Sequence, residues 1–446
     1  MNLNNSKKDK INKGLKMWEQ AKKLIPGGNG LLSKRPERYA PDIWPAYFSK
    51  AKGVEVWDLD NIKYIDMAYM GVGTSILGYS DNDVDAAVKT AIDRGINTTL
   101  NAPEEVYLAK KLVELNPFAG SVKFTRTGGE AMAVTVRIAR AYTGRDKVAF
   151  SGYHGWCDWY LAANLSGENK LEGHLLPGLF PKGVPAGLRG TALPFEYNNV
   201  EAFKELVSRH KDIGTIVIEG ARYSLPSREF IQVIKSVAQE NKMVVIFDEI
   251  TSGWRITDGG VYKKIGFQPD IVVYGKAMGN GFAIAAIVGR HEVMDAAQDS
   301  FISSTFWTER VGFVAALATI KKLIQNKVWE HLIGVGTKIG EGWESLAKKY
   351  SIKLHVTDFK PLITMKFEYD KLNSAIATLF IQEMLKKGYL ASTSVYVSYA
   401  HTNKIVEQYL KSVDEVFAII SEAINTDSVY QKLETKVKEE GFKRLT

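Results

Sequence analysis

The chain has 446 residues, of which 45% are hydrophobic and 24% charged, and its formal net charge is +8. This is enough for a sizeable core in two or three domains, and the scattered Lys and Arg residues form no basic stripe that would indicate a nucleic-acid partner. The single cysteine, Cys157, excludes an internal disulfide, and the His residues lack the spacing of metal ligands. We expect no signal peptide and no membrane span, because the start is polar and every apolar run is short. The cytoplasm is the expected compartment.

The first predicted elements are a helix and a small sheet. Residues 7–24 carry apolar side chains at helical spacing, and Pro26-Gly27-Gly28 ends this helix. Residues 45–68 alternate apolar and polar side chains around a turn at 58–61, which is typical of an antiparallel sheet.

From about residue 80 the pattern changes to helical stretches, such as 82–94 and 103–115, that alternate with short apolar runs. The predicted strands are residues 122–124, 148–150, 215–218, 244–247 and 271–273. Buried strands that alternate with helices indicate an α/β fold with a mostly parallel sheet covered by helices. Ligands bind such sheets at the carboxyl ends of the strands.

A second region begins near residue 326. We predict strands at 352–356 and 362–367, a helix at 403–424, and a loosely held helix in the last twenty residues. The predicted domains are therefore residues 76–325 as a large domain, with residues 1–75 and 326–446 as the two parts of a smaller α+β domain.

Two motifs follow the first two strands of the large region. Residues 125–131 (TRTGGEA) form a turn of small residues before a helix, and such a turn suits a phosphate because it exposes backbone N–H groups. Thr127 would add a hydroxyl donor, although a plain glycine turn explains the motif equally well. In residues 151–156 (SGYHGW), an aromatic ring would stack on a planar heterocycle or simply belong to the core.

Two charged residues follow later strands. Asp248 comes directly after a very apolar run, where an acid is costly unless it is paired; a protonated pyridine nitrogen is one such partner, and a helix N-cap is the alternative role. Lys276 follows another strand between small residues, where burial would make its amine nucleophilic, unless its stem carries the charge out to solvent.

The order of these motifs resembles the class III aminotransferases of the type I pyridoxal-phosphate (PLP) fold, and among them the glutamate-1-semialdehyde 2,1-aminomutase-like proteins. The resemblance runs from about Pro26 to about Phe417 and rests on residues 152–155 (GYHG), 248–255 (DEITSGWR) and Gly275-Lys276. It implies a PLP-binding large domain, a small domain built from both chain ends, and a homodimer with shared active sites.

The resemblance also implies individual roles. Lys276 would be the Schiff-base lysine and proton shuttle, and Asp248 would pair with the pyridine nitrogen. Tyr153 and Ile250 would cover the two faces of the ring. The remaining cofactor-binding residues would be Thr127, Gly128, Gly129, His154, Glu219 and, reaching the phosphate of the neighbouring subunit, Thr305.

The sequence departs from the family in regions that face the substrate. The phosphate turn has Thr127-Gly128-Gly129 where Ser-Gly-Thr is usual, and Trp307 adds bulk after Thr305. The aminomutase's Glu-Ala-Gly-Phe stretch is shortened to residues 394–398. The expected substrate-binding arginine is not in register, and Lys34 or Arg35 would have to replace it.

Three functional hypotheses follow. The first is a transaminase that moves an amino group from a small amine donor to a ketone or aldehyde. The second is an intramolecular aminomutase acting on glutamate-1-semialdehyde or a similar amino-aldehyde. The third is a non-catalytic PLP-binding protein, which the presence of Lys276, Asp248 and Tyr153 disfavours. Four aromatic residues would line the entrance, or equally well the core or the dimer interface: Trp156, Trp159, Tyr160 and Trp307.

Overall fold

The N-terminal segment forms the predicted helix and antiparallel sheet. A computed structural model describes residues 12–167, 170–174 and 177–445. Its first elements are α1 (Lys13–Leu24), β1 (Phe48–Lys52), β2 (Glu55–Asp58) and β3 (Lys63–Met67). The helix prediction is confirmed from residue 13 on, and residues 7–11 lie outside the described part. Strand β13 (Tyr389–Ala391) pairs in parallel with β3, so the two ends of the chain build this sheet together.

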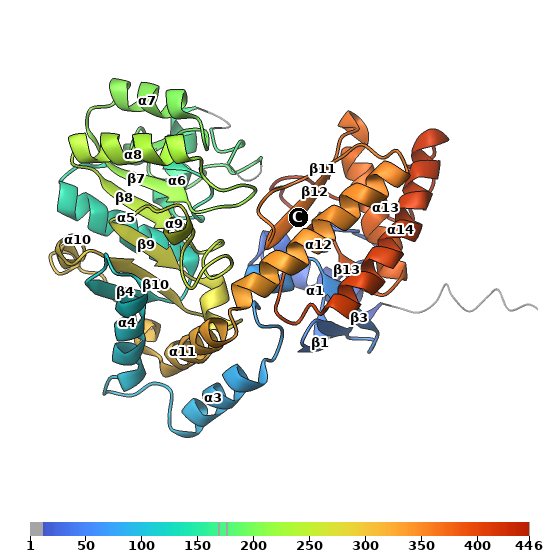
Figure 1. Cartoon of the computed structure of the whole chain (residues 1–446), viewed down its shortest axis with the longest axis horizontal. Helices are drawn as coiled ribbons and strands as arrows, with labels where there is room; N and C mark the ends of the chain where they lie inside the picture. Colours follow the sequence, from blue (N-terminus) through green and yellow to red (C-terminus); the bar gives the residue numbers. More distant parts are fainter. Residues whose placement is uncertain (1–11, 168–169, 175–176, 446) are drawn as a thin grey trace, which may run out of the picture.

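A seven-stranded sheet forms the centre of the large lobe, on the left in Figure 1. Its order is β4 (Ser121–Thr125), β10 (Ala285–Gly289), β9 (Ile271–Tyr274), β8 (Val244–Asp248), β7 (Ile213–Glu219), β5 (Lys147–Ser151) and β6 (Ala192–Pro194). All five predicted strands are confirmed. The sequence analysis missed β6 and β10, and β10 is antiparallel to both of its neighbours.

Both faces of this sheet are buried, which explains its continuous apolar runs. Alternate residues of one strand enter different cores: Ile246 packs with the residues of α5, whereas Val245 and Phe247 pack on the opposite face. Helix α5 (Gly128–Thr143) crosses one face, while α7 (Val200–Arg209) and α8 (Arg228–Glu240) cover the other, as Figure 1 shows. The mostly parallel α/β prediction is confirmed.

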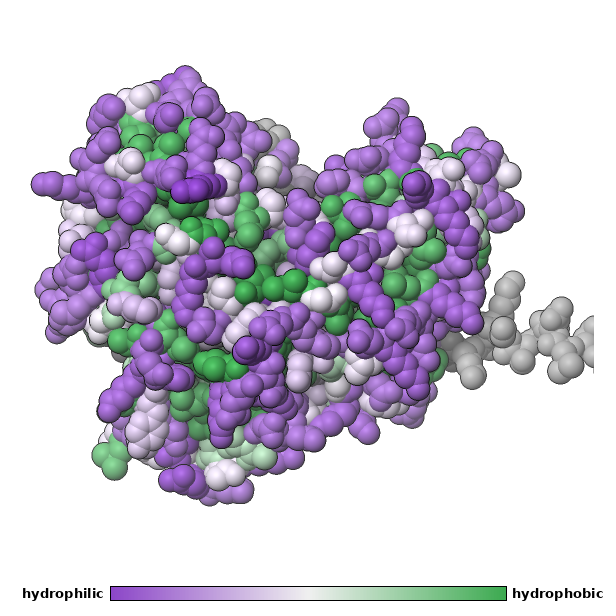
Figure 2. All heavy atoms as spheres, in the orientation of Figure 1, coloured by the Kyte–Doolittle hydropathy of each residue, from purple (hydrophilic) through white to green (hydrophobic). Residues whose placement is uncertain are grey.

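The other helices surround the sheet or lead away from it. They are α2 (Met70–Gly73), α3 (Asn82–Asp93), α4 (Pro103–Leu115), α6 (Asp158–Leu161), α9 (Val261–Lys264), α10 (His291–Met294) and α11 (Arg310–Gln325). In the described part of the chain, no helix is long and apolar enough to cross a membrane. The face drawn in Figure 2 is mostly hydrophilic, and hydrophobic residues show through over the large lobe.

The C-terminal region forms the second lobe, on the right in Figure 1. It contains α12 (Val328–Lys349), α13 (Asn373–Lys386) and α14 (Asn403–Asn425) beside a sheet of β11 (Leu354–Val356), β12 (Leu362–Phe367) and β14 (Ser394–Tyr396). Both predicted strands and the helix at 403–424 are therefore present. The exact domain boundaries at residues 75 and 325 stay a prediction.

The end of the chain forms no helix, so that prediction was wrong. The tail instead makes backbone hydrogen bonds to distant segments, from Glu439 N–H to Glu37 O (2.7 Å) and from Phe442 N–H to Pro177 O (2.9 Å). Arg38 Nη1 donates to Glu439 O at 2.8 Å. These distant partners provide hydrogen bonds to the backbone of the tail, so the tail does not need a helix to satisfy its N–H and C=O groups.

Candidate active site

Three of the predicted residues meet at the carboxyl edge of the central sheet. Glu219 and Asp248 are register partners at the ends of β7 and β8, and Asp248 is paired in turn with Val273 of β9. Lys276 follows directly after β9 and Gly275. This edge is where parallel α/β sheets bind their ligands.

The side chain of Asp248 is held between two partners. The residue is 4% exposed, its Oδ2 lies 2.8 Å from His154 Nδ1, and its Oδ1 accepts a hydrogen bond from Ile250 N–H at 3.0 Å. His154 is itself fixed by its Nε2, which lies 3.1 Å from Ser151 O. A carboxylate oxygen has room for a further donor, so Asp248 is able to accept the proton of a ring nitrogen as well.

Lys276 lies at a constrained backbone position and points into the site. Its φ is +40°, which is unusual for a residue with a side chain and is often found at functional sites. Its Nζ donates to Thr251 Oγ1 at 2.8 Å. Burial and then the charge of Arg222 lower the pKa of Lys276 from 10.5 to about 8, although Glu219 and Asp248 act in the opposite direction. About a tenth of this amine is therefore neutral, and hence nucleophilic, at pH 7, far more than for an ordinary lysine.

The predicted phosphate turn is the N-terminus of α5. Thr127 is the N-cap of this helix: its hydroxyl accepts from Glu130 N–H (3.4 Å) and donates to Glu130 Oε2 (3.0 Å). These bonds occupy the threonine hydroxyl, whereas the first N–H groups of a helix have no partner within it. A phosphate at this turn would therefore rely mainly on the backbone of Gly128 and Gly129, as the sequence analysis predicts.

The two glycines of the turn leave space that a side chain would fill. A Cβ atom on Gly128 would lie 3.0 Å from Ile250 Cδ1, and one on Gly129 would lie 2.8 Å from Trp156 Nε1. Ile250 also faces Gly275, while the half-buried Tyr153 lies edge-on to Tyr160 at 5.8 Å. The site thus combines an acid, a nucleophilic amine, an anion-binding turn and two side chains, Tyr153 and Ile250, that would lie against the faces of a flat ring. This combination fits PLP.

The four aromatic residues of open assignment have different environments. Trp159 and Tyr160 are buried in the core beside Phe150. Trp156 is 68% exposed next to Gly129, and Trp307 packs against the edge of the same core. Thr305 is exposed at the start of a 3-10 turn, Thr305–Thr308, so its predicted role toward a second subunit remains a prediction.

The sequence analysis did not identify three polar residues of the site. The hydroxyl of Thr251 accepts a hydrogen bond from the Lys276 amine, and its backbone carbonyl accepts one from Arg255 Nε at 2.6 Å. Arg222 donates to Glu219 through Nε (3.0 Å) and Nη2 (2.5 Å). Thr251 and Arg255 lie within the quoted 248–255 motif, which was a usable signal. No sequence motif pointed to Arg222, because it reaches Glu219 only through the turn that follows β7.

Arg35, one proposed substitute for the substrate arginine, is engaged elsewhere. It is 7% exposed, its Nη1 donates to Lys443 O at 3.1 Å, and its guanidinium lies 5.6 Å from the centre of the Phe442 ring. Lys34 is exposed. The C-terminal tail therefore uses Arg35 for packing.

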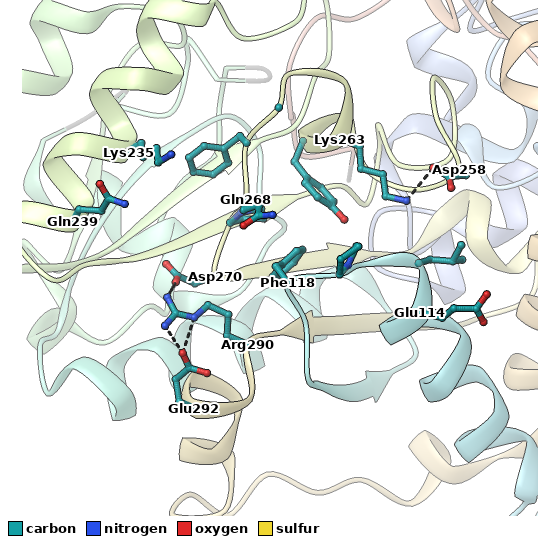
Figure 3. Close-up of a pocket in the computed structure, with 16 residues that line it drawn as sticks. Glu114, Phe118, Lys235, Gln239, Asp258, Lys263, Gln268, Asp270, Arg290 and Glu292 are labelled. Carbon is teal, nitrogen blue, oxygen red and sulfur yellow. Dashed lines mark hydrogen bonds and ion pairs between the residues drawn. The ribbon is translucent and has the colours of Figure 1, made fainter.

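A cavity of about 1000 Å³ lies at the opposite edge of the sheet. Asp270 precedes β9 and Arg290 follows β10 there, and Figure 3 shows Arg290 between Asp270 and Glu292. This cavity is thus separate from the carboxyl-end site. Among the described residues, no group of His, Cys, Asp and Glu is arranged to hold a metal ion.

The fold and this site define a PLP-dependent enzyme that transfers amino groups between small molecules. The chain belongs to the aminotransferase class-III family, whose model matches residues 39–424. It is 30% identical to a 3-aminobutyryl-CoA aminotransferase of Cloacimonas acidaminovorans, over 94% of this chain and 100% of that protein. It is 29% identical to a glutamate-1-semialdehyde 2,1-aminomutase of Methanocaldococcus jannaschii, over 92% and 98% of the two chains.

A solved structure has the same fold. The PLP internal aldimine form of the FumI protein from Sphingopyxis sp. MTA144 superposes with a TM-score of 0.84 at 24% identity, and the match covers 96% of this chain and 99% of that one. The predictions of family, fold class and PLP as cofactor are confirmed.

Proposed function

We propose that Lys276 is the residue that joins PLP covalently and moves the proton in transamination between an amine donor and a ketone or aldehyde acceptor. The observation that carries this proposal is the position of its amine, which lies at the carboxyl edge of the sheet, 2.8 Å from Thr251 Oγ1, with a pKa lowered to about 8. When bound, the cofactor supplies an aldehyde that condenses with amines and a ring that withdraws electrons.

Other residues hold the reacting parts in place. Asp248, oriented by His154, would keep the ring nitrogen protonated. Tyr153 and Ile250 would cover the two ring faces, while Gly128 and Gly129 would bind the phosphate with backbone N–H groups. Once the incoming amine has released it from the cofactor, the free amine of Lys276 would take a proton from the substrate carbon and give it back on the other side of the reacting bond, and Thr251 would hold this amine in place.

Absorption spectroscopy of the purified protein with PLP tests this assignment. We expect a visible band from the protein-bound cofactor that disappears when a productive amine donor is added and returns with a carbonyl acceptor. Lys276→Ala should bind PLP without this exchange. Failure of the native protein to exchange with every donor tried would refute the proposal.

The intramolecular aminomutase is the second candidate, because a relative of 29% identity carries that name. The two activities differ in their need for a separate donor. Product formation from glutamate-1-semialdehyde alone, with no added amine and no pyruvate or other acceptor, would favour the mutase. A strict requirement for two substrates would favour the transferase.

We further propose a cytoplasmic homodimer in which Thr305 reaches the phosphate bound by the neighbouring subunit. Its support is the exposure of Thr305 in the isolated chain, together with the neighbouring Phe306, which is 66% exposed. Mixing Lys276→Ala chains with Thr305→Ala chains tests this arrangement. Shared sites would regenerate one intact site in each mixed dimer, with native affinity for PLP, whereas sites within one chain would give only the average of the two variants.

A further inference from the structure

The turn that would hold the cofactor phosphate has few side-chain donors of its own. The hydroxyl of Thr127 is bonded in both directions to Glu130, and Gly129 stands where the resemblance leads one to expect a threonine. The N-terminus of α5 therefore offers an anion mainly backbone N–H groups. A phosphate has three strong acceptor oxygens, so a further side-chain donor beside this turn would improve its binding.

A second loop lies directly against Gly129. This loop follows β5 and runs from Gly152 to Cys157. The Sγ of Cys157 donates to Gly129 O at 3.3 Å, and a Cβ atom on Gly155 would lie 3.1 Å from Gly129 Cα. Gly155 also has a φ of +101°, which a residue with a side chain rarely adopts. The absence of a side chain at Gly155 therefore lets the loop approach the turn this closely.

The indole of Trp156 fills the space beside Gly129. A Cβ atom on Gly129 would lie 2.8 Å from Nε1 and 3.1 Å from Cδ1 of this ring. The Cα–Cβ bonds of a helix tilt toward its N-terminus, so this space lies toward the end of α5 where an anion would bind. The ring thus stands where the side chain of a threonine at position 129 would be, with its only polar atom nearest to the turn.

The N–H group of this indole is not used within the protein. Among the residues that the structure describes, no protein atom accepts a hydrogen bond from it. The side chain of Trp156 is 68% exposed, whereas Trp159, three residues later, is buried in the core. A tryptophan side chain offers one donor and no acceptor, which suits contact with an anion. An exposed ring with an unused donor beside an anion-binding turn indicates a ligand contact rather than a packing role.

We propose that the indole N–H of Trp156 donates a hydrogen bond to the phosphate of PLP and replaces the hydroxyl that Gly129 cannot supply. The two solutions exclude each other, because a side chain at position 129 would displace the indole. Trp156 is then a cofactor-binding residue, and Gly155 positions it. This inference rests on the phosphate turn of the proposed function and not on the role of Lys276.

Two forms of vitamin B6 that differ only by the phosphate test the inference: pyridoxamine 5′-phosphate and pyridoxamine. Neither has an aldehyde, so their binding requires no imine with Lys276. Trp156→Phe keeps a flat ring but removes the N–H. In calorimetry on the full-length protein without PLP, this variant should bind pyridoxamine 5′-phosphate about tenfold more weakly, the loss expected for one hydrogen bond to a charged group, and bind pyridoxamine as before. Trp57→Phe on β2 is the matched control and should change neither dissociation constant.

Substitutions at Gly129 test whether a hydroxyl can replace the indole. In the native background, Gly129→Ala should displace the ring and weaken pyridoxamine 5′-phosphate as much as Trp156→Phe does. In the Trp156→Ala background the space beside the turn is vacated. There Gly129→Ser should recover most of the lost affinity, whereas Gly129→Ala should recover none, because serine and alanine differ only by the hydroxyl. Melting temperatures of all variants check that the fold is kept.

The outcomes separate this inference from the proposed function. If Trp156→Phe weakens both ligands equally or neither of them, or if Gly129→Ser recovers no more affinity than Gly129→Ala, the indole does not bind the phosphate. A native protein that exchanges no amine, but whose affinity for the phosphate form alone depends on the indole N–H, would refute the proposed function and support this inference. A protein that exchanges amines and binds both ligands normally without the indole N–H would do the reverse.

Discussion

Glu219 and Asp248 are register partners on adjacent strands, yet each carboxylate has a different cationic or proton-donating partner: Arg222 for Glu219 and His154 for Asp248. Two buried carboxylates side by side repel each other unless each has a partner. Arg222 binds Glu219 through two atoms, whereas His154 contacts Asp248 through one. This asymmetry fits the role proposed for Asp248, which keeps acceptor capacity for a protonated ring nitrogen.

Asp248→Asn should lower kcat by at least about 100-fold, because the neutral amide no longer stabilises a protonated pyridine nitrogen and the ring withdraws electrons less strongly. The side chain keeps its shape and its contact with His154, so the melting temperature should change little. Steady-state kinetics and thermal unfolding of the PLP-bound variant check both expectations. A loss of activity that only accompanies unfolding would contradict the assigned role.

Glu249→Gln is the matched control for an adjacent buried acid. Glu249 is 0% exposed and accepts from Ser252 Oγ (2.5 Å) and Tyr262 N–H (3.2 Å), and burial raises its pKa to about 8. At neutral pH the acid is mostly protonated, and glutamine resembles that form. We expect near-native turnover from this variant, in contrast to Asp248→Asn.

The same residue predicts a dependence of stability on pH. Because the pKa of Glu249 is higher in the folded state than the ordinary value of 4.5, the folded state binds more protons between these values. Its contribution to stability is present below about pH 4.5 and is lost as the pH rises through about 8. The melting temperature of the native protein should therefore fall relative to that of Glu249→Gln across this range. Parallel curves for the two proteins would contradict the raised pKa.

Lys276 should make the capture of PLP by the cofactor-free protein depend on pH. Only the neutral amine attacks an aldehyde, so the capture rate should rise with pH and reach half of its maximum near pH 8, where Lys276 titrates. Arg222→Gln should move this midpoint upward, since the arginine charge helps to lower the pKa. Stopped-flow absorbance between pH 6 and 10 measures both midpoints. An unchanged midpoint in the variant would mean that Arg222 is farther from the amine than we infer.

The elements and residues that could be predicted from the sequence are those marked by a local pattern of apolar and polar residues. Asp248 and Lys276 could be found because each directly ends a short apolar run, and two-sided burial makes such runs easy to recognise. Strand β10 was missed because Ala285–Gly289 follows another apolar, glycine-containing stretch without a break. Arg222 and the C-terminal tail were missed or mispredicted because their conformations depend on contacts with Glu219 and with segments near residues 37 and 177, which are tertiary effects.

Gly128→Ala should weaken PLP binding although alanine favours helices. The new Cβ would lie 3.0 Å from Ile250 Cδ1, so it would displace this side chain, for which we propose contact with the ring, and it would crowd the phosphate turn. Fluorescence titration should give a dissociation constant at least about tenfold higher, which corresponds to about 1.4 kcal/mol.

Gly334→Ala on α12 is the control, because a Cβ there meets nothing within 4 Å. It should raise the free energy of unfolding by about 0.5–1 kcal/mol and leave PLP affinity unchanged. Equal PLP affinities for the two variants would show that the space beside Ile250 is not needed for the cofactor.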